Sequence, residues 1–247
     1  MSHAQRQRLP LAPEPPPRSD GSRNDNPPGM GLWALWCEDL RTHEGNPFEQ
    51  GFWAVAVHRF GNWRMGLPKL VRAPFTLAYL FLVKWVQVTC GISLHYNSRL
   101  GRRVHIWHHS GMILVARSIG DDCHIRHNTT LGVVRRDQPL GIPIIEERVD
   151  IGCGVAILGN VRVGHDSVIG ANSVVLDDVP PWTVVAGAPA RVVRELIVPA
   201  GIAGNDAGED DPERTQRDWP TLRQDRRIAT SLQKPAAPSR PPASRTR

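Results

Sequence analysis

The feature that most constrains this chain is a six-residue repeat of aliphatic side chains. Glycine often follows the aliphatic residue, and a small or β-branched residue is common four positions after it. A period of six fits neither an α-helix nor an array of β-hairpins, and it indicates a parallel β-helix in which each hexad supplies one short strand and one turn. Three hexads then complete one triangular coil, with the aliphatic side chains stacked inside. The predicted inward positions are Leu94, Leu100, Ile106, Ile113, Ile119, Ile125, Leu131, Ile145, Ile151, Ile157, Val163, Ile169 and Val175.

The repeat is broken at two places. The first break lies between Ile106 and Ile113, where one extra residue falls within or just after the stretch His108-His109-Ser110-Gly111. The second is an excursion of about eight residues within residues 134–142. Insertions in a stiff repeat scaffold become surface loops, often at the binding face. We therefore expect both breaks to mark the functional side of the β-helix.

The histidines around the first break form two predicted columns. Adjacent coils differ by about eighteen residues, or nineteen where the extra residue intervenes, so His108 stacks under His127 and His105 under His124. His108 and His127 each follow an inward aliphatic residue by two positions, near a corner of the triangle. Such a cluster is open to three interpretations, namely a general base with helpers, a metal site or an exposed polar rim.

Composition divides the remaining chain into segments. Residues 1–29 and 199–247 are rich in Pro, Gly, Ser and charged side chains and cannot bury enough apolar surface, so we expect two disordered tails. Residues 1–29 also lack the apolar region of a secretory signal. Residues 30–90 carry apolar side chains at helical spacing and predict a small α-helical domain. Residues 91–195 hold the predicted β-helix, which makes the fold class mainly β.

The segment 74–89 is apolar nearly all round, which raises the question of a membrane. It is short for a bilayer span and is interrupted by Lys84 and Gln87. The pattern favours a helix buried in the helical domain or at a subunit interface. Peripheral contact with a membrane is the alternative.

Charge and cysteine content narrow the partners and the compartment. The net charge is +6, and every charged residue past Asp225 is basic, after an acidic run around Glu209. That pattern has no interleaved aromatic stacking platform, so it favours a solvated tail over a nucleic-acid site. The four cysteines form no C-x-x-C pair, which argues against a disulfide framework and for a reducing, cytoplasmic compartment. They are Cys37, Cys90, Cys123 and Cys153.

Four stretches carry a resemblance to a known family. They are GISLHYNSRLGRRVHIWHHSG, IGDDCHIRHNTTLG, IGCGVAILGNVRVG and IGANSVVLDDVPPWTVVAGAPARVV. Together they resemble the serine O-acetyltransferase family, a branch of the hexapeptide acyltransferases built on a left-handed β-helix. The resemblance covers roughly residues 31–195, and the ending from Val179 to Arg191 is its most specific marker.

The resemblance implies transfer of an acetyl group from acetyl-CoA to a hydroxyl group, at a cleft between subunits of a homotrimer or a dimer of trimers. It implies that His108, in the His-x-x-Gly element, is the general base, since an imidazole with a pKa near 7 suits that role. A nearby backbone N–H would hold the tetrahedral oxyanion. We expect His127 to orient the acceptor or share the proton. The expected acceptor-binding residues are His109, Asn128, Arg135 and Arg136.

The resemblance also implies a groove for CoA between C-terminal coils, where pantetheine contacts backbone at small residues. The matching positions are Gly132, Gly152, Cys153, Gly170 and Ala171, and Arg191 lies where it would meet a phosphate. The family uses acetyl-CoA as a co-substrate, and we expect no metal.

Several positions depart from the family pattern at the acceptor end. The family's Asp before the base is Trp107 here, the Asp that orients the base is Ser93, and the acidic residue before Pro47 is Asn46. The family's second His, preceded by Arg before a Pro in the loop, aligns with Ile142. The family residues at these four positions are the ones expected to bind a zwitterionic amino acid, and this chain lacks them. We therefore expect a sugar acceptor, as in exopolysaccharide or capsule synthesis, with L-serine in cysteine biosynthesis as the alternative.

Two interpretations from other classes stay open. A γ-carbonic-anhydrase-like metalloenzyme also uses a β-helix and gathers three histidines across an interface, although the His-x-x-Gly element and the A-G-x-P-A-R ending speak against it. A β-helix that scaffolds a biosynthetic complex would explain the departures as lost chemistry.

Overall fold

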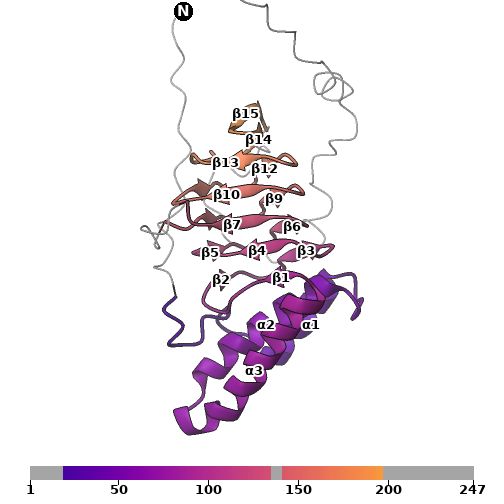
Figure 1. Ribbon diagram of the computed structural model, residues 1–247, viewed down its shortest axis with the longest axis vertical. Helices are drawn as coiled ribbons and strands as arrows, with labels where there is room; N and C mark the ends of the chain where they lie inside the picture. Colours follow the sequence, from indigo (N-terminus) through magenta and orange to yellow (C-terminus); the bar gives the residue numbers. More distant parts are fainter. Residues whose placement is uncertain (1–18, 135–140, 197–247) are drawn as a thin grey trace, which may run out of the picture. The chain divides into compact units, whose positions relative to one another are not determined.

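The computed structural model describes residues 19–134 and 141–196, which form three helices followed by a parallel β-helix (Figure 1). The helices are α1 (Leu32–Thr42), α2 (Gln50–Trp63) and α3 (Lys69–Thr89), with a 3-10 turn η1 (Arg64–Gly66) between the last two. α3 begins earlier than the predicted segment 74–89 and contains Pro74. The predicted order of a helical segment and then a β-helix is confirmed.

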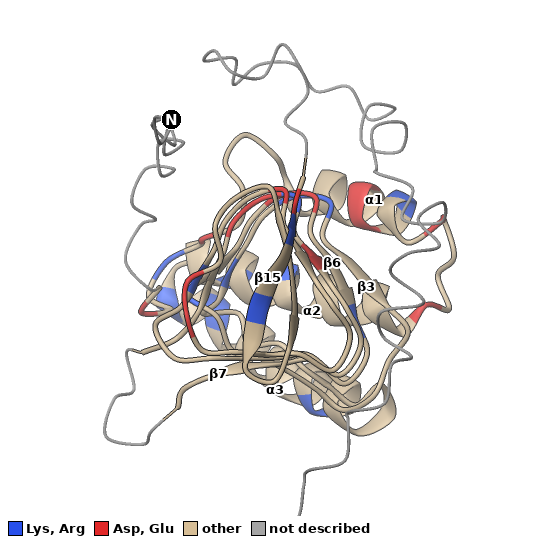
Figure 2. Ribbon diagram, turned by 90° about the horizontal axis from the view of Figure 1, so that it is seen from above, with Lys and Arg blue, Asp and Glu red and all other residues tan. Residues whose placement is uncertain are grey.

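Short strands in the described residues build three parallel sheets, one for each side of the coil. The first sheet has the order β1-β4-β7-β10-β13, the second β11-β8-β5-β2, and the third β15-β14-β12-β9-β6-β3. Only β14 and β15 pair antiparallel among these strands. Seen down the axis, successive coils lie almost on top of one another (Figure 2). The strands are β1 (Ile92–Ser93), β2 (Arg99–Leu100), β3 (His105–Trp107), β4 (Met112–Leu114), β5 (Ser118–Ile119), β6 (His124–Arg126), β7 (Thr130–Gly132), β8 (Ile144–Ile145), β9 (Asp150–Ile151), β10 (Ala156–Leu158), β11 (Arg162–Val163), β12 (Val168–Ile169), β13 (Val174–Val175), β14 (Thr183–Gly187) and β15 (Ala190–Glu195).

The predicted inward positions are buried, with one exception. Ile113 is 50% exposed, whereas Leu114 is fully buried and pairs with Leu131 in the next coil. The prediction of Ile113 was therefore wrong by one position. Both residues are aliphatic, so the period alone does not choose between them. The loop before β4 absorbs one more residue than the spacing indicated.

A buried ion pair joins the helices to the first coil. Arg59 on α2 and Asp39 on α1 are both fully buried, and Nε of Arg59 lies 3.1 Å from Oδ2 of Asp39. The same guanidinium donates hydrogen bonds of 2.8 Å to the carbonyl of Leu100 and 2.6 Å to that of Gly101. A buried charge persists only when it is paired and hydrogen-bonded, so this network fixes the helices against the base of the β-helix.

The N-terminal boundary lies earlier than predicted. Residues 19–29 belong to the segment expected as a tail, yet they pack against the helices. The backbone N–H of Asp25 donates to Oδ1 of Asn62 at 3.3 Å, and Nδ2 of Asn26 donates to the carbonyl of Arg59 at 2.9 Å. Asp25 also pairs with Arg99. Polar side chains with buried partners can order a segment that composition alone marks as unstructured.

α3 is less buried than its composition indicated. Only Tyr79 and Val86 are buried on it, whereas Leu77, Phe81 and Val88 are more than two-thirds exposed. Burial within the chain's own helical domain is thus not found on this side of α3, because its main packing partners, α2, η1 and β1, leave these side chains exposed. The other predicted setting, a subunit interface, stays a prediction. No helix in the described part of the chain is long and apolar enough to cross a membrane.

Candidate active site

The first predicted histidine column lies at the corner that follows the third sheet. Trp107 on β3 pairs in register with Arg126 on β6, so the next residues, His108 and His127, face each other across adjacent coils. Their ring centroids are 5.6 Å apart, with the planes at 66°. In the same register Cys153 follows β9 and Ala171 follows β12. The corner thus carries two imidazoles and then two small side chains.

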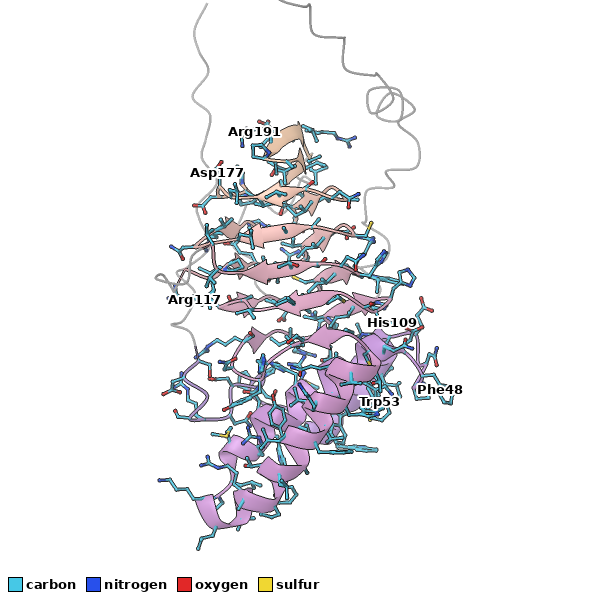
Figure 3. All side chains as sticks on the ribbon, viewed as in Figure 1. Phe48, Trp53, His109, Arg117, Asp177 and Arg191 are labelled. Atoms are coloured by element: carbon cyan, nitrogen blue, oxygen red, sulfur yellow. The ribbon has the colours of Figure 1, made fainter. Side chains whose placement is uncertain are left out.

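The loop that carries His108 has an unusual backbone. His108 (φ 62°), Ser110 (φ 87°) and Gly111 (φ 65°) all lie in the left-handed region, which is costly for residues with a Cβ and is tolerated mainly at functional sites and tight turns. The backbone N–H of Ser110 donates to the carbonyl of Cys90 at 3.0 Å. The loop therefore sits over the end of α3, and both His108 and His109 are exposed. Figure 3 shows His109 at the surface.

Asn128 closes this loop from the neighbouring coil. Its backbone N–H donates to the carbonyl of Ser110 at 3.1 Å. Its side-chain Oδ1 occupies the space where a Cβ on Gly111 would lie. Glycine is therefore required at position 111 for two reasons, the left-handed φ and the close approach of Asn128. This contact gives Asn128 a structural role beside its predicted role in acceptor binding.

The second histidine column is separate from the first, and its rings already contact Trp107. His105 pairs in register with His124, as predicted. The ring of His105 stacks on Trp107 at 3.8 Å between centroids, and Nε1 of Trp107 donates to Nδ1 of His124 at 2.8 Å. Burial lowers the pKa of His105 to about 3 and also lowers the pKa of His124. The rings of His105 and His124 are neutral and packed, whereas the ring of His108 is exposed.

A buried histidine at the C-cap of α1 extends the second column, and sequence reasoning missed it. The ring of His43 lies 4.6 Å from that of His105 between centroids. Nδ1 of His43 bonds with the carbonyl of Asp39 at 2.7 Å, and Nε2 accepts the backbone N–H of Ile106 at 3.3 Å. Burial lowers the pKa of His43. Its contact spans two segments far apart in sequence, so no local pattern pointed to it.

The two imidazoles of the first column have free ring nitrogens within the described residues. No hydrogen bond there orients the ring of His108, and Nδ1 of His127 is buried without a partner. Ser93, which replaces the expected orienting Asp, instead accepts a long hydrogen bond from Gln87 at 3.4 Å. An unpaired buried nitrogen costs free energy unless a ligand or a neighbouring chain satisfies it, which favours this corner as the reactive one.

The predicted CoA residues fall into two groups. Gly152 and Gly170 lie at the same corner as His108, but their own chain requires them to be glycine. A Cβ on Gly152 would lie 2.6 Å from the backbone nitrogen of Ala171, and one on Gly170 would lie 2.9 Å from Cβ of Ala186. Gly132, at the end of β7, has nothing within 4 Å of that position. Its missing side chain leaves open space at the surface.

Arg191 lies at the far end of the β-helix from the helices (Figure 3). It is on β15, and β14, β12, β9 and β6 separate that strand from β3. With strands about 4.8 Å apart, β14 is roughly 19 Å from β3, a span of the order of an extended phosphopantetheine arm. Arg191 is exposed and makes one long ion pair of 3.5 Å with the exposed Asp177. Its guanidinium is therefore accessible to a phosphate.

Other predicted site residues are not brought to this corner or lie outside the described residues. Arg135 and Arg136 belong to residues 135–140, which the structure does not describe. Ile142, at the end of that loop, is 1% exposed and faces the interior. Within residues 19–134 and 141–196, no group of three His, Cys, Asp or Glu side chains is arranged to hold a metal ion.

Comparison with known proteins gives consistent relatives, although no family model matches the chain. The serine acetyltransferase of Salmonella typhimurium is 37% identical over 145 residues, which are 58% of this chain and 51% of that protein. The chain spans about half the length of the curated relatives it matches.

Solved structures give the same result. The soybean serine acetyltransferase apoenzyme matches with a TM-score of 0.55 and 31% identity, over 66% of this chain and 69% of that one. Serine acetyltransferase from Brucella abortus strain S19, solved in complex with coenzyme A, matches with a TM-score of 0.55 and 29% identity, over 66% and 67% of the two chains.

Proposed function

The chain belongs to the serine O-acetyltransferase family of hexapeptide-repeat proteins, and on that premise we propose that it transfers an acetyl group from acetyl-CoA to a hydroxyl group. The observation that carries the proposal is the corner where His108 faces His127 at 5.6 Å, followed along the axis by the small residues Cys153 and Ala171. The exposed imidazole of His108, with His127 beside it, supplies acid–base chemistry, and small side chains leave room for a long, narrow substrate.

In the proposed reaction His108 removes the proton of the acceptor hydroxyl as its oxygen attacks the thioester carbonyl carbon. The tetrahedral intermediate collapses when the carbon–sulfur bond breaks, and the departing CoA thiolate takes the proton back from the His108 imidazolium. His127 holds the acceptor hydroxyl beside His108, or shares the proton. No acetylated enzyme forms, so the reaction requires no nucleophilic side chain of the protein.

The relatives favour L-serine as the acceptor. They are named serine acetyltransferases, so the comparisons support the serine alternative better than the predicted sugar acceptor, which finds no support among them. The serine carboxylate would need a cation, and Arg126 is already paired with Asp150. We assign that role to Arg135 and Arg136, whose bidentate guanidinium groups suit a carboxylate.

We also propose that the reactive corner is completed by a second copy of the chain in a homotrimer. Ile113 and Leu176, on and beside the first sheet, and Val134, after β7, are each about half exposed. Exposed apolar side chains along one side of the β-helix are typical of subunit interfaces. Equilibrium sedimentation tests this assignment, and a monomer at micromolar concentration would contradict it.

The direct test of the proposed function is release of free CoA thiol from acetyl-CoA with purified protein. The acceptors are L-serine, L-threonine, glucose, galactose and N-acetylglucosamine, each at the same concentration. Release that depends on L-serine supports the proposal in full. Release that depends only on a sugar would keep acetyl transfer and overturn the serine assignment. If none of the acceptors raises the release of CoA thiol above background, the proposed function is contradicted.

A further inference from the structure

A cavity remote from the reactive corner lies between the helices and the first coil. Its volume is about 470 Å³, within the usual range for sites that bind small molecules. Residues of η1, α3 and the turn after β1 line it, so it opens beside a different corner of the β-helix from that of His108. The lining includes Arg64, Arg72, Tyr79, Leu80, His95 and Tyr96.

Arg64 is the central feature of this cavity. The residue is only 5% exposed, and its guanidinium carbon lies 4.5 Å and 4.7 Å from the ring centroids of Tyr79 and Tyr96. One of its nitrogens, Nη1, donates to Oγ1 of Thr76 at 3.1 Å. Its Nε is buried and makes no hydrogen bond with any described residue. Aromatic faces and a hydroxyl solvate the cation only in part.

Arg64 also lacks a carboxylate, unlike comparable arginines nearby. Arg59, which is also buried, pairs with Asp39, and Arg102 pairs with Glu38 at 2.7 Å. No ion pair joins Arg64 to an acidic side chain in the described part of the chain. A buried charge without a partner is strongly destabilising, so a cavity beside such a charge is suited to an anion.

A second guanidinium converges on the same point. Nη1 of Arg64 and Nη1 of Arg72 both contact the sulfur of Met65, at 3.2 Å and 3.6 Å. Arg72 also makes no ion pair with a described acidic residue. The exposed His95 lines the same cavity and provides a further donor. Two like charges held this close repel each other unless an anion lies between them.

We infer that this cavity binds a small organic anion. Arg64 and Arg72 hold its phosphate or sulfate group, and Tyr96, Leu80 and Val83 contact its apolar part. Guanidinium groups match the geometry of these oxyanions, and the apolar wall gives room for an ester substituent. The inference rests on the helices and the first coil alone, and it is independent of the proposed acetyl transfer.

The test measures binding of inorganic phosphate to the full-length protein by isothermal titration and by thermal unfolding, against sodium chloride of matched ionic strength. We expect phosphate, but not chloride, to raise the Tm of the wild type. The variant Arg72→Gln should weaken the Kd for phosphate at least tenfold, because it removes one of the two guanidinium groups that hold the anion. Arg72 is partly exposed, so its replacement does not disturb the core. The matched control Lys69→Gln, on the same helix but outside the cavity, should stay within twofold of the wild type.

Arg64→Gln should abolish phosphate binding, and Arg72→Gln keeps the test decisive if that variant fails to fold. Sedimentation with phosphatidylglycerol vesicles distinguishes a lipid headgroup from a free phosphate. Vesicle binding that Arg72→Gln weakens supports the anion site with a lipid as its source. Equal phosphate affinity in the wild type and Arg72→Gln, without Arg72-dependent vesicle binding, would overturn the inference.

Discussion

Nε1 of Trp107 donates a 2.8 Å hydrogen bond to Nδ1 of His124 in the adjacent coil, while its ring stacks on His105. This contact turns Trp107 away from His108, although the two residues are neighbours in sequence. In the family, the residue before the base is acidic and contributes to the acceptor site. Here that position holds two coils together, so the proposed acceptor site would depend on other residues.

Trp107→Phe should therefore affect stability more than turnover. Phenylalanine keeps the stacking on His105 but removes the donor to His124, which costs about 1 kcal/mol of unfolding free energy for a lost hydrogen bond. We expect kcat to remain within a few-fold of the wild type. Urea unfolding and the CoA-release assay measure the two quantities. A hundredfold loss of kcat with unchanged stability would assign Trp107 to the chemistry instead.

The buried pair of Arg59 and Asp39 should dominate the stability of the helical segment. Asp39→Asn leaves the Arg59 charge buried without a counterion, and we expect a loss of about 3–5 kcal/mol. Asp177→Asn is the matched control, because its ion pair with Arg191 is exposed and should contribute less than about 1 kcal/mol. Similar losses in the two variants would show that burial does not set the strength of these pairs.

Stability should fall in acid because of a buried neutral histidine. Burial lowers the pKa of His58 to about 3, below its ordinary value of 6.5, so between these values the unfolded chain binds a proton that the folded chain does not. Below pH 6.5 this one group lowers the unfolding free energy by about 1.4 kcal/mol per pH unit, down to about pH 3.

Urea unfolding at pH 7.5 and pH 5 measures this effect. His58→Gln retains a donor for the carbonyl of Ser98, which Nε2 of His58 contacts at 2.8 Å, but it does not titrate. The variant should therefore lose about 2 kcal/mol less than the wild type between the two pH values. An identical pH dependence in both proteins would contradict the assignment.

Gly132 and Gly152 should respond differently to added side chains. Gly132→Val projects into open space, so we expect the Tm to stay within about 2 °C while the KM for acetyl-CoA rises at least tenfold. Gly152→Ala places a methyl group 2.6 Å from the nitrogen of Ala171 and should destabilise the coil by about 1–3 kcal/mol. If Gly132→Val left the KM for acetyl-CoA unchanged, the groove would lie elsewhere.

The sequence predicted the β-helix, the three stacked sides and the pairing of His105 with His124, because the six-residue period sets which residues lie one coil apart. It placed the inward residue at Ile113 instead of Leu114. The loop from His108 to Gly111 uses left-handed backbone at non-glycine residues, and a hydrophobic pattern cannot predict such backbone conformations.

The sequence pattern did not predict side-chain contacts between segments that are distant in sequence. The ring of His43 contacts that of His105 where the helices join the first coil of the β-helix, and Arg64 contacts the ring of Tyr96 in the cavity proposed to bind an anion. Each contact depends on side-chain conformations in two elements at once. Periodicity reports only which face of one element is apolar, so burial of charge at Arg64 became visible only with the fold.

The measurement that tests the central claim most directly is the rate of CoA release with L-serine for the wild type and for His108→Ala. His95→Ala is the matched control, since it removes an exposed histidine that lies outside the proposed acetyl-transfer site. We predict a loss of 10²- to 10⁴-fold in kcat for His108→Ala, typical of removing a general base, with unchanged Tm, and less than a twofold loss for His95→Ala. An unchanged rate in His108→Ala would contradict the account.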